Sequence, residues 1–189
     1  MKHTTTNRTL LSFWLLSISG AALAHPGHAA TGFSAGLMHP FTGMDHLLTM
    51  FAIGLWATQM SGRKIWLLPA TFTFMLIAGA GLSLVYQSLP LLEPGIAVSV
   101  LTLGLLIALS LRLPVLLSAS ITAMFGLLHG YAHGLEMPGA SAPVAYALGF
   151  LITTAILHMI GIGVGVATRA RFIQALGVAI AFSGIWMLG

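Results

Sequence analysis

The sequence predicts an all-α membrane protein with six transmembrane helices after a cleaved N-terminal signal peptide, and three observations support this fold class. Hydrophobic residues make up 58% of the 189 residues and charged residues only 5%, whereas soluble domains carry about 25% charged residues. The mean hydropathy is +1.00. Long apolar runs alternate with short loops along the chain. There are no cysteines, which excludes disulfides and thiolate metal sites.

Residues 1–24 have the pattern of a secretory signal peptide. Lys2 and Arg8 supply a basic start, an apolar run follows from Leu10 to Leu23, and small residues at Ala22 and Ala24 form a cleavage site. The alternative is an uncleaved first transmembrane helix. The apolar run is only about 14 residues long, however, and a span needs about 20. We therefore expect a mature chain of residues 25–189 that forms one six-helix transmembrane domain.

Six apolar spans are expected in that domain, with bounds good to a few residues. The third and fourth are short and are joined by a tight turn at Arg112-Leu113-Pro114. The expected spans are Ser34–Ala57, Ile65–Tyr86, Gly95–Leu111, Pro114–Tyr131, Val144–Ala167 and Phe172–Leu188.

The loop charges predict how these spans are oriented. Glu93 and Glu136 are expected in loops on one side, whereas the basic residues of the mature chain all fall on the other; these are Arg63, Lys64, Arg112, Arg169 and Arg171. The positive-inside rule makes the basic side cytoplasmic. We therefore expect a multi-pass protein of the bacterial inner membrane, with the mature N-terminus and the C-terminus in the periplasm. The few scattered basic residues do not indicate a nucleic-acid partner.

Two short segments of similar sequence are compatible with a three-plus-three inverted repeat. Gly36-Leu37-Met38-His39 opens the first span, and Gly126-Leu127-Leu128-His129 lies late in the fourth. These two spans run in opposite directions, as such repeats in secondary transporters require. Four residues of a chain rich in Gly and Leu also match by chance.

The first expected span carries three polar residues that are costly inside a membrane: His39, Asp45 and His46. An ionised Asp near the bilayer centre costs about 3 kcal/mol. On a continuous helix His39 and His46 share one face two turns apart, Asp45 lies about 100° from His46, and Met50 follows His46 one turn later. Imidazole, carboxylate and thioether ligands suit a first-row divalent transition metal. The stretch therefore predicts an intramembrane metal site.

Further histidines extend this prediction. His129 and His133 are four residues apart on one helix face, which Glu136 continues, and such a pair can share one ion; the alternative is that they are solvated or bonded to backbone. His158, near the middle of the fifth span, is either a ligand or a core histidine bonded to a carbonyl. His25 and His28, at the mature N-terminus, either capture metal or belong to a mobile tail.

The two motifs together resemble the hydrogenase/urease accessory HupE/UreJ family of nickel permeases. They are His39-Pro40-x-x-Gly43-x-Asp45-His46 and His129-Gly130-Tyr131-Ala132-His133-Gly134-x-Glu136, and the resemblance covers essentially the whole chain. The first motif is similar to the His-x4-Asp-His signature of larger nickel/cobalt transporters but is one residue longer.

The resemblance implies uptake of Ni²⁺, or Co²⁺ in some members, from periplasm to cytoplasm for metalloenzyme assembly. His39, Asp45, His46, His129 and His133 would form the metal path, with Glu136 a candidate. The ion would be cargo rather than a permanently bound cofactor, the protein would not be an enzyme, and its partners would be the lipid bilayer and cytoplasmic metallochaperones of hydrogenase or urease.

Three other functions remain open at this stage. Histidines on neighbouring membrane helices ligate haem in b-type electron-transfer proteins, although the tight clusters here favour a small ion. A membrane protein that binds metal without transporting it has the same residues. An intramembrane metallohydrolase is disfavoured because the sequence lacks HExxH and its only glutamates are Glu93 and Glu136.

Overall fold

The computed structural model describes residues 32–60, 62–137 and 142–189, and every regular element in those ranges is a helix. This confirms the all-α class. The predicted signal peptide, together with His25 and His28, lies outside the described residues. The elements are α2 (Phe33–Met38), the 3₁₀ helix η1 (His39–Phe41), α3 (Met44–Ala57), the 3₁₀ helix η2 (Gly62–Trp66), α4 (Leu67–Ser83), α5 (Leu92–Ala108), α6 (Val115–Glu136), α7 (Pro143–Ala167) and α8 (Ala170–Trp186).

Three of the helical segments are long and apolar enough to cross a membrane: Gly62–Ser83, Val115–Glu136 and Pro143–Ala167. The helices α3, α5 and α8 are also apolar but shorter, with 10–17 residues each. Together with the composition, these helices are those of a membrane protein. The count of six spans stays a prediction.

The first expected span is not one continuous helix, which corrects the sequence-based expectation. The chain forms α2, then the single 3₁₀ turn η1, and starts again as α3 after Gly43, whose backbone is extended (φ −112°, ψ 121°). Pro40 explains the interruption because it lacks the N–H that a continuing α-helix would use and its ring crowds the preceding turn. The break lies between His39 and His46, within the predicted metal motif.

Two further bounds differ from expectation. The helix α6 continues five residues beyond the expected end at Tyr131 and finishes at Glu136, so that Glu136 is helical. Glu93 lies in the first turn of α5. Neither glutamate is therefore in a loop, and both carboxylates lie at the ends of helices.

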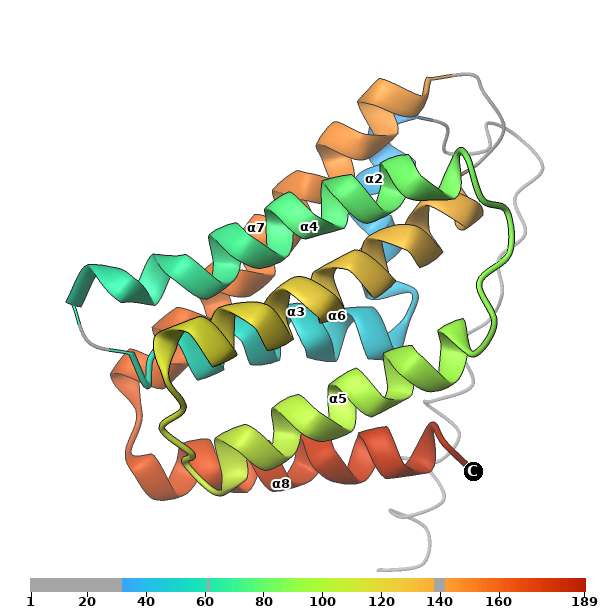
Figure 1. The fold of residues 1–189 in the computed structure, drawn as a ribbon. Coiled ribbons are helices and arrows are strands. Elements are labelled where there is room, and N and C mark those ends of the chain that lie inside the picture. The colour runs from blue at the N-terminus through green and yellow to red at the C-terminus, as the bar shows by residue number, and fades with distance from the viewer. Residues whose placement is uncertain (1–31, 61, 138–141) are drawn as a thin grey trace, which may run out of the picture.

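The helices associate in three groups that glycines hold together at close range (Figure 1). The helix α4 packs on α6, α5 packs on α8, and α7 packs on both α2 and α3. A Cβ on Gly79 would overlap the carbonyl oxygen of Leu127, and one on Gly130 would overlap that of Leu76, so α4 and α6 meet backbone to backbone. Small residues allow this contact in membrane helices, where van der Waals packing drives association.

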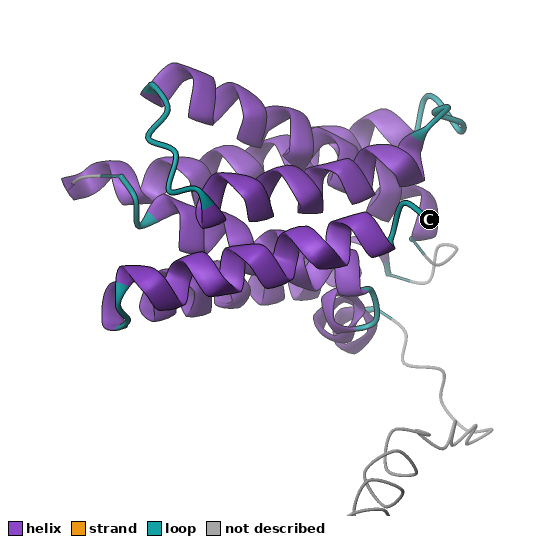
Figure 2. Ribbon diagram, turned by 90° about the horizontal axis from the view of Figure 1, so that it is seen from below, coloured by secondary structure: helices purple, strands orange, loops and turns teal. Residues whose placement is uncertain are grey.

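The pair α5–α8 forms one side of the bundle, next to α3 and α6 (Figure 1). Viewed from below, the helices run alongside one another with loops at both ends (Figure 2). The core between them is apolar and includes the fully buried side chains of Met50, Ile53, Val100, Leu103 and Ile107. Buried polar side chains lie among them, including Thr49, Thr122 and His129.

Candidate metal site

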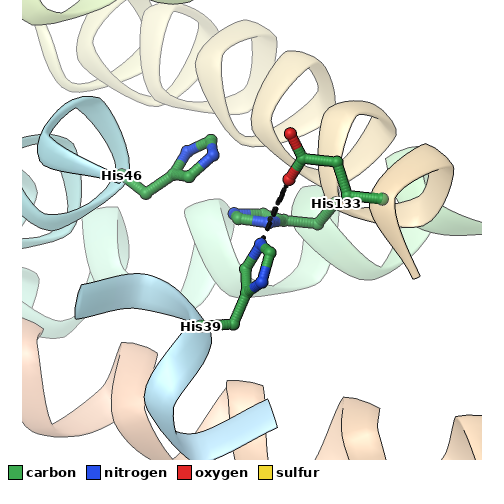
Figure 3. Close-up of side chains that lie close together, drawn as sticks. His39, His46 and His133 are labelled. Carbon is green, nitrogen blue, oxygen red and sulfur yellow. Dashed lines mark hydrogen bonds and ion pairs between the residues drawn. The ribbon is translucent and has the colours of Figure 1, made fainter. Parts of the chain in front are cut away.

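Four side chains from three elements converge on one point: His39 from η1, His46 from α3, and His133 and Glu136 from α6 (Figure 3). One ligand atom from each lies within 4.8 Å of the others. His39 Nε2 is 3.1 Å from Glu136 Oε2, and His133 Nδ1 is 3.8 Å from the same oxygen. The ring centroids of His46 and His133 are 4.0 Å apart. We refer to these four residues as the metal cluster.

The break in the first expected span makes this convergence possible. On a continuous helix, seven residues would separate His39 and His46 by about 10 Å along the axis, whereas their ring centroids are 6.2 Å apart. Gly43 also leaves room for the side chains that follow it. A Cβ at this position would come within 2.7 Å of Asp45 Oδ1 and 2.8 Å of His46 Cδ2.

Two of the three imidazoles of the metal cluster, those of His46 and His133, are buried and have ring nitrogens without a hydrogen-bond partner. His46 is 5% and His133 3% exposed, and neither His46 Nδ1 nor either ring nitrogen of His133 has a partner. Buried polar atoms are nearly always paired, so several orphaned nitrogens in one place need an explanation. Three imidazoles and one carboxylate are a donor set for a divalent transition-metal ion, and such an ion would satisfy them.

A cavity of about 470 Å³ adjoins the metal cluster, because His46 and Glu136 belong to both. Asp45, His46, Glu93 and Glu136 line it. The chain has only three acidic residues, and all of them border this one space although they come from three different helices. We refer to it as the acidic cavity. Its negative charge would concentrate cations at the entrance to the cluster.

Glu93 is the residue of the acidic cavity that sequence reasoning missed, because it was interpreted only as a loop charge. The signal was available, because an acidic residue in so apolar a chain is costly and is a candidate for function by default. Its place beside Asp45 and Glu136 depends on how α5 packs against α3 and α6, which spacing does not reveal.

Asp45 and His129 lie directly next to the metal cluster. Asp45 Oδ1 is 4.0 Å from His46 Nδ1 and accepts the backbone N–H of His46 at 2.9 Å. His129 is fully buried, with its ring centroid 5.4 Å from that of His46. Its Nδ1 lies 2.9 Å from the carbonyl oxygen of Phe125, so Nδ1–H donates there and the unpartnered Nε2 keeps a free lone pair.

His158 and Met50 are buried but are not part of the cluster. The ring of Phe72 contacts both His158 and His129, with centroids 5.5 Å and 5.8 Å away, and His158 Nε2 has no partner. The sulfur of Met50 lies 3.4 Å from the hydroxyl oxygen of Thr154. The structure thus brings His39, His46, His133 and Glu136 together, places Asp45 and His129 beside them, and leaves His158 and Met50 apart.

Comparison with known proteins gives a consistent result. The family model described as HupE / UreJ protein matches residues 13–187. Protein HupE from Rhizobium leguminosarum bv. viciae is 38% identical over 192 aligned residues, which cover 100% of this chain and 99% of that protein. No solved structure matches the chain.

Proposed function

This chain belongs to the HupE/UreJ family, and we propose that it is a permease that imports a divalent transition-metal ion from periplasm to cytoplasm. The ion we propose is Ni²⁺, with Co²⁺ as the alternative. The observation that carries this proposal is the convergence of three imidazoles and one carboxylate beside a cavity lined by every acidic residue of the chain.

The donor set suits transport better than permanent binding. Neutral imidazole replaces a water ligand without adding charge, and Glu136 alone among the four cluster residues offsets part of the 2+ charge. Conduction requires binding that is strong enough to remove water and weak enough to release the ion. A site with several carboxylates or thiolates at bonding distance would hold the ion longer, and the chain has no cysteine.

The proposed membrane setting follows from the charges. We propose six spans in the inner membrane, with the acidic cavity facing the periplasm and the basic loops facing the cytoplasm. The ion would be captured by the acidic cavity, exchange water for imidazole at the metal cluster, and pass to cytoplasmic metallochaperones of hydrogenase or urease. In a mature chain that begins at residue 25, His25 and His28 would add two imidazoles on the periplasmic side.

Uptake of ⁶³Ni²⁺ into cells that express the full chain tests this function, with unlabelled Co²⁺, Zn²⁺, Cu²⁺ and Mg²⁺ as competitors. We expect uptake above empty-vector cells, best inhibited by Co²⁺, and loss of uptake in His46→Ala and Asp45→Ala. Met44→Ala changes an exposed neighbour and serves as the matched control. Membrane fractions are blotted to show equal insertion of each variant. Uptake that persists in both site variants would contradict the assignment.

A metal-binding protein without transport is the second candidate, favoured by the same cluster. Binding of Ni²⁺ to the purified protein, measured by isothermal titration calorimetry, separates the two. Binding with no uptake by the well-inserted protein would support this second function and exclude the permease.

A further inference from the structure

A second cavity, of about 540 Å³, lies at the other end of the same helices. The start of α3 borders the acidic cavity at Asp45 and His46, and its far end borders the second cavity at Trp56. In α5 the corresponding residues are Glu93 and Ser110, which lies two residues after the end of the helix; in α6 they are Glu136 and Ser118. Lys64 and Arg112 also line the second cavity, which we call the basic cavity. The two cavities therefore lie at opposite ends of α3, α5 and α6.

A polar stripe on α6 connects the two cavities. At 100° per residue, its members lie within about 60° of one another on the helix; they are Ser118, Thr122, His129, His133 and Glu136. On α3, Asp45, Thr49 and Trp56 share a face in the same way. Apart from His129, which lies next to the metal cluster, Thr49 and Thr122 are the polar residues of these two faces between the metal cluster and the basic cavity.

The hydroxyls of Thr49 and Thr122 are orphaned. Both residues are fully buried, and neither Oγ1 has a hydrogen-bond partner. The two other buried threonines of the described residues, Thr153 and Thr154, donate to the carbonyls of Leu37 and Phe150. An unpaired buried hydroxyl costs free energy, and valine would fill nearly the same volume without that cost. Two such hydroxyls between two cavities therefore indicate a polar ligand that passes there.

We propose that the imported ion leaves the metal cluster along the space between α3, α5 and α6, with Thr49 and Thr122 as its polar contacts halfway, and exits through the basic cavity. This route rests on the proposed function. Neutral hydroxyl oxygens are weak ligands for Ni²⁺, so they let the ion pass without trapping it. The positive charges of Lys64 and Arg112 then oppose its return.

The route is closed in this conformation and needs a movement of α5. Its side chains between the two cavities include Val100, Leu103 and Ile107, all fully buried. The helix α5 packs mainly on α8, with smaller contacts to α3 and α6. The pair α5–α8 is therefore the unit that can shift relative to the rest and open the space, as one part of an alternating-access transporter rocks against another.

The experiment compares uptake with binding in Thr49→Val, Thr122→Val and the double variant. We expect the double variant to lower the ⁶³Ni²⁺ uptake rate at least about tenfold, an effect of about 1.4 kcal/mol on the barrier. Ni²⁺ affinity of the purified full chain should stay within about twofold, because the metal cluster is intact. Thr→Ser at both positions restores the hydroxyls and should restore uptake. Thr102→Val makes the same change on α5 at a half-buried position that lines neither cavity and should leave uptake unchanged.

Each other outcome is informative. Normal uptake in the double variant would overturn the route while leaving the permease intact. Equal loss of uptake and affinity would mean that the threonines support the cluster, and it would also overturn the route. No uptake by the wild-type chain would instead remove the proposed function itself.

A second measurement does not depend on the threonine variants. The chain has no cysteine, so Ser110→Cys gives a single thiol in the basic cavity. A bulky maleimide on Ser110→Cys should block uptake, whereas the same label on Leu109→Cys, an exposed neighbour that does not line the cavity, should not. Full uptake by labelled Ser110→Cys would overturn the exit.

Discussion

Gly43 separates the two histidines of the first motif without itself offering a ligand. Its Cα has no substituent, and the space that a Cβ would fill is occupied by Asp45 Oδ1 and His46 Cδ2. Gly43→Ala should displace both side chains, because relieving such an overlap forces shifts that cost about 1–3 kcal/mol. We expect Ni²⁺ affinity of the purified protein to fall about tenfold. Gly81→Ala, where a Cβ meets nothing, is the control, and equal affinities would show that Gly43 does not shape the site.

Glu136 is the carboxylate of the metal cluster, and its charge should determine affinity. Glu136→Gln keeps the size of the side chain but removes the negative charge that faces His39 and His133. A bond to a charged group contributes about 1.5–3 kcal/mol, so we expect Ni²⁺ affinity to drop about 10- to 100-fold, measured by calorimetry. An affinity within twofold of wild type would remove Glu136 from the set of ligands.

Glu93 should act on the rate of capture rather than on affinity. It lines the acidic cavity but is not in the metal cluster, and distant charges of this kind steer ions toward a site. Glu93→Gln should lower ⁶³Ni²⁺ uptake severalfold at low external nickel, and the difference should shrink as salt is added. A decrease that is independent of both nickel and salt would mean a structural role instead.

The sequence identifies most of these residues because ionisable groups are so rare in the apolar chain. His39, Asp45, His46, His129, His133 and Glu136 are all predicted from motif and spacing, and all lie in the cluster or next to it. What spacing alone does not reveal is the contact between α6 and the η1–α3 break. His158 and Met50 share the residue types of the site, yet packing directs them elsewhere.

At the scale of elements, the break between η1 and α3 is the feature that sequence reasoning left out. Apolar residues lie on both sides of the break, in α2 and in α3, so the sequence pattern predicts a single span. Pro40 is the local signal, and its effect on a helix interior is known. The remaining helices were predicted to within about five residues at each end because apolar runs and loop charges mark them clearly.

The helix α7 offers a direct test of close helix packing. A Cβ on Gly161 would overlap the carbonyl oxygen of Phe51 on α3, whereas one on Gly163 would meet nothing. Gly161→Ala should lower the free energy of unfolding by about 1–3 kcal/mol and reduce the melting temperature in detergent. Gly163→Ala should be neutral or stabilising, since alanine favours helix by about 0.5–1 kcal/mol. Equal melting temperatures for the two variants would show that α3 and α7 can move apart to accommodate the added methyl group at no cost in stability.

At the scale of the whole molecule, the helix pairing is what a three-plus-three inverted repeat requires. In such a repeat, spans one, two and three correspond to spans four, five and six. The first span (α2–α3) packs on the fifth (α7), so the fourth span (α6) should pack on the second (α4), and it does. The pairing of the third with the sixth, α5 with α8, maps onto itself. The repeat stays a prediction, and this agreement supports it beyond the two short segments of similar sequence around His39 and His129.

Charge is also divided between the two ends, and this division predicts the direction of transport. All three carboxylates line the acidic cavity, and Lys64 and Arg112 line the basic one. Met187, just after α8, borders the acidic cavity, so the C-terminal end of the chain lies on the acidic side.

The positive-inside rule predicts that the basic end lies in the cytoplasm. Alkaline phosphatase fused after Gly189 should therefore be active in the periplasm, and the same enzyme fused after Arg112 should be inactive. A fluorescent protein that matures only in the cytoplasm should give the reverse pattern at the two positions. If the C-terminal fluorescent fusion is bright instead, the acidic cavity faces the cytoplasm. Because that cavity is where cations gather before they reach the cluster, the chain would then collect its ion from inside the cell, and import would have to be replaced by export.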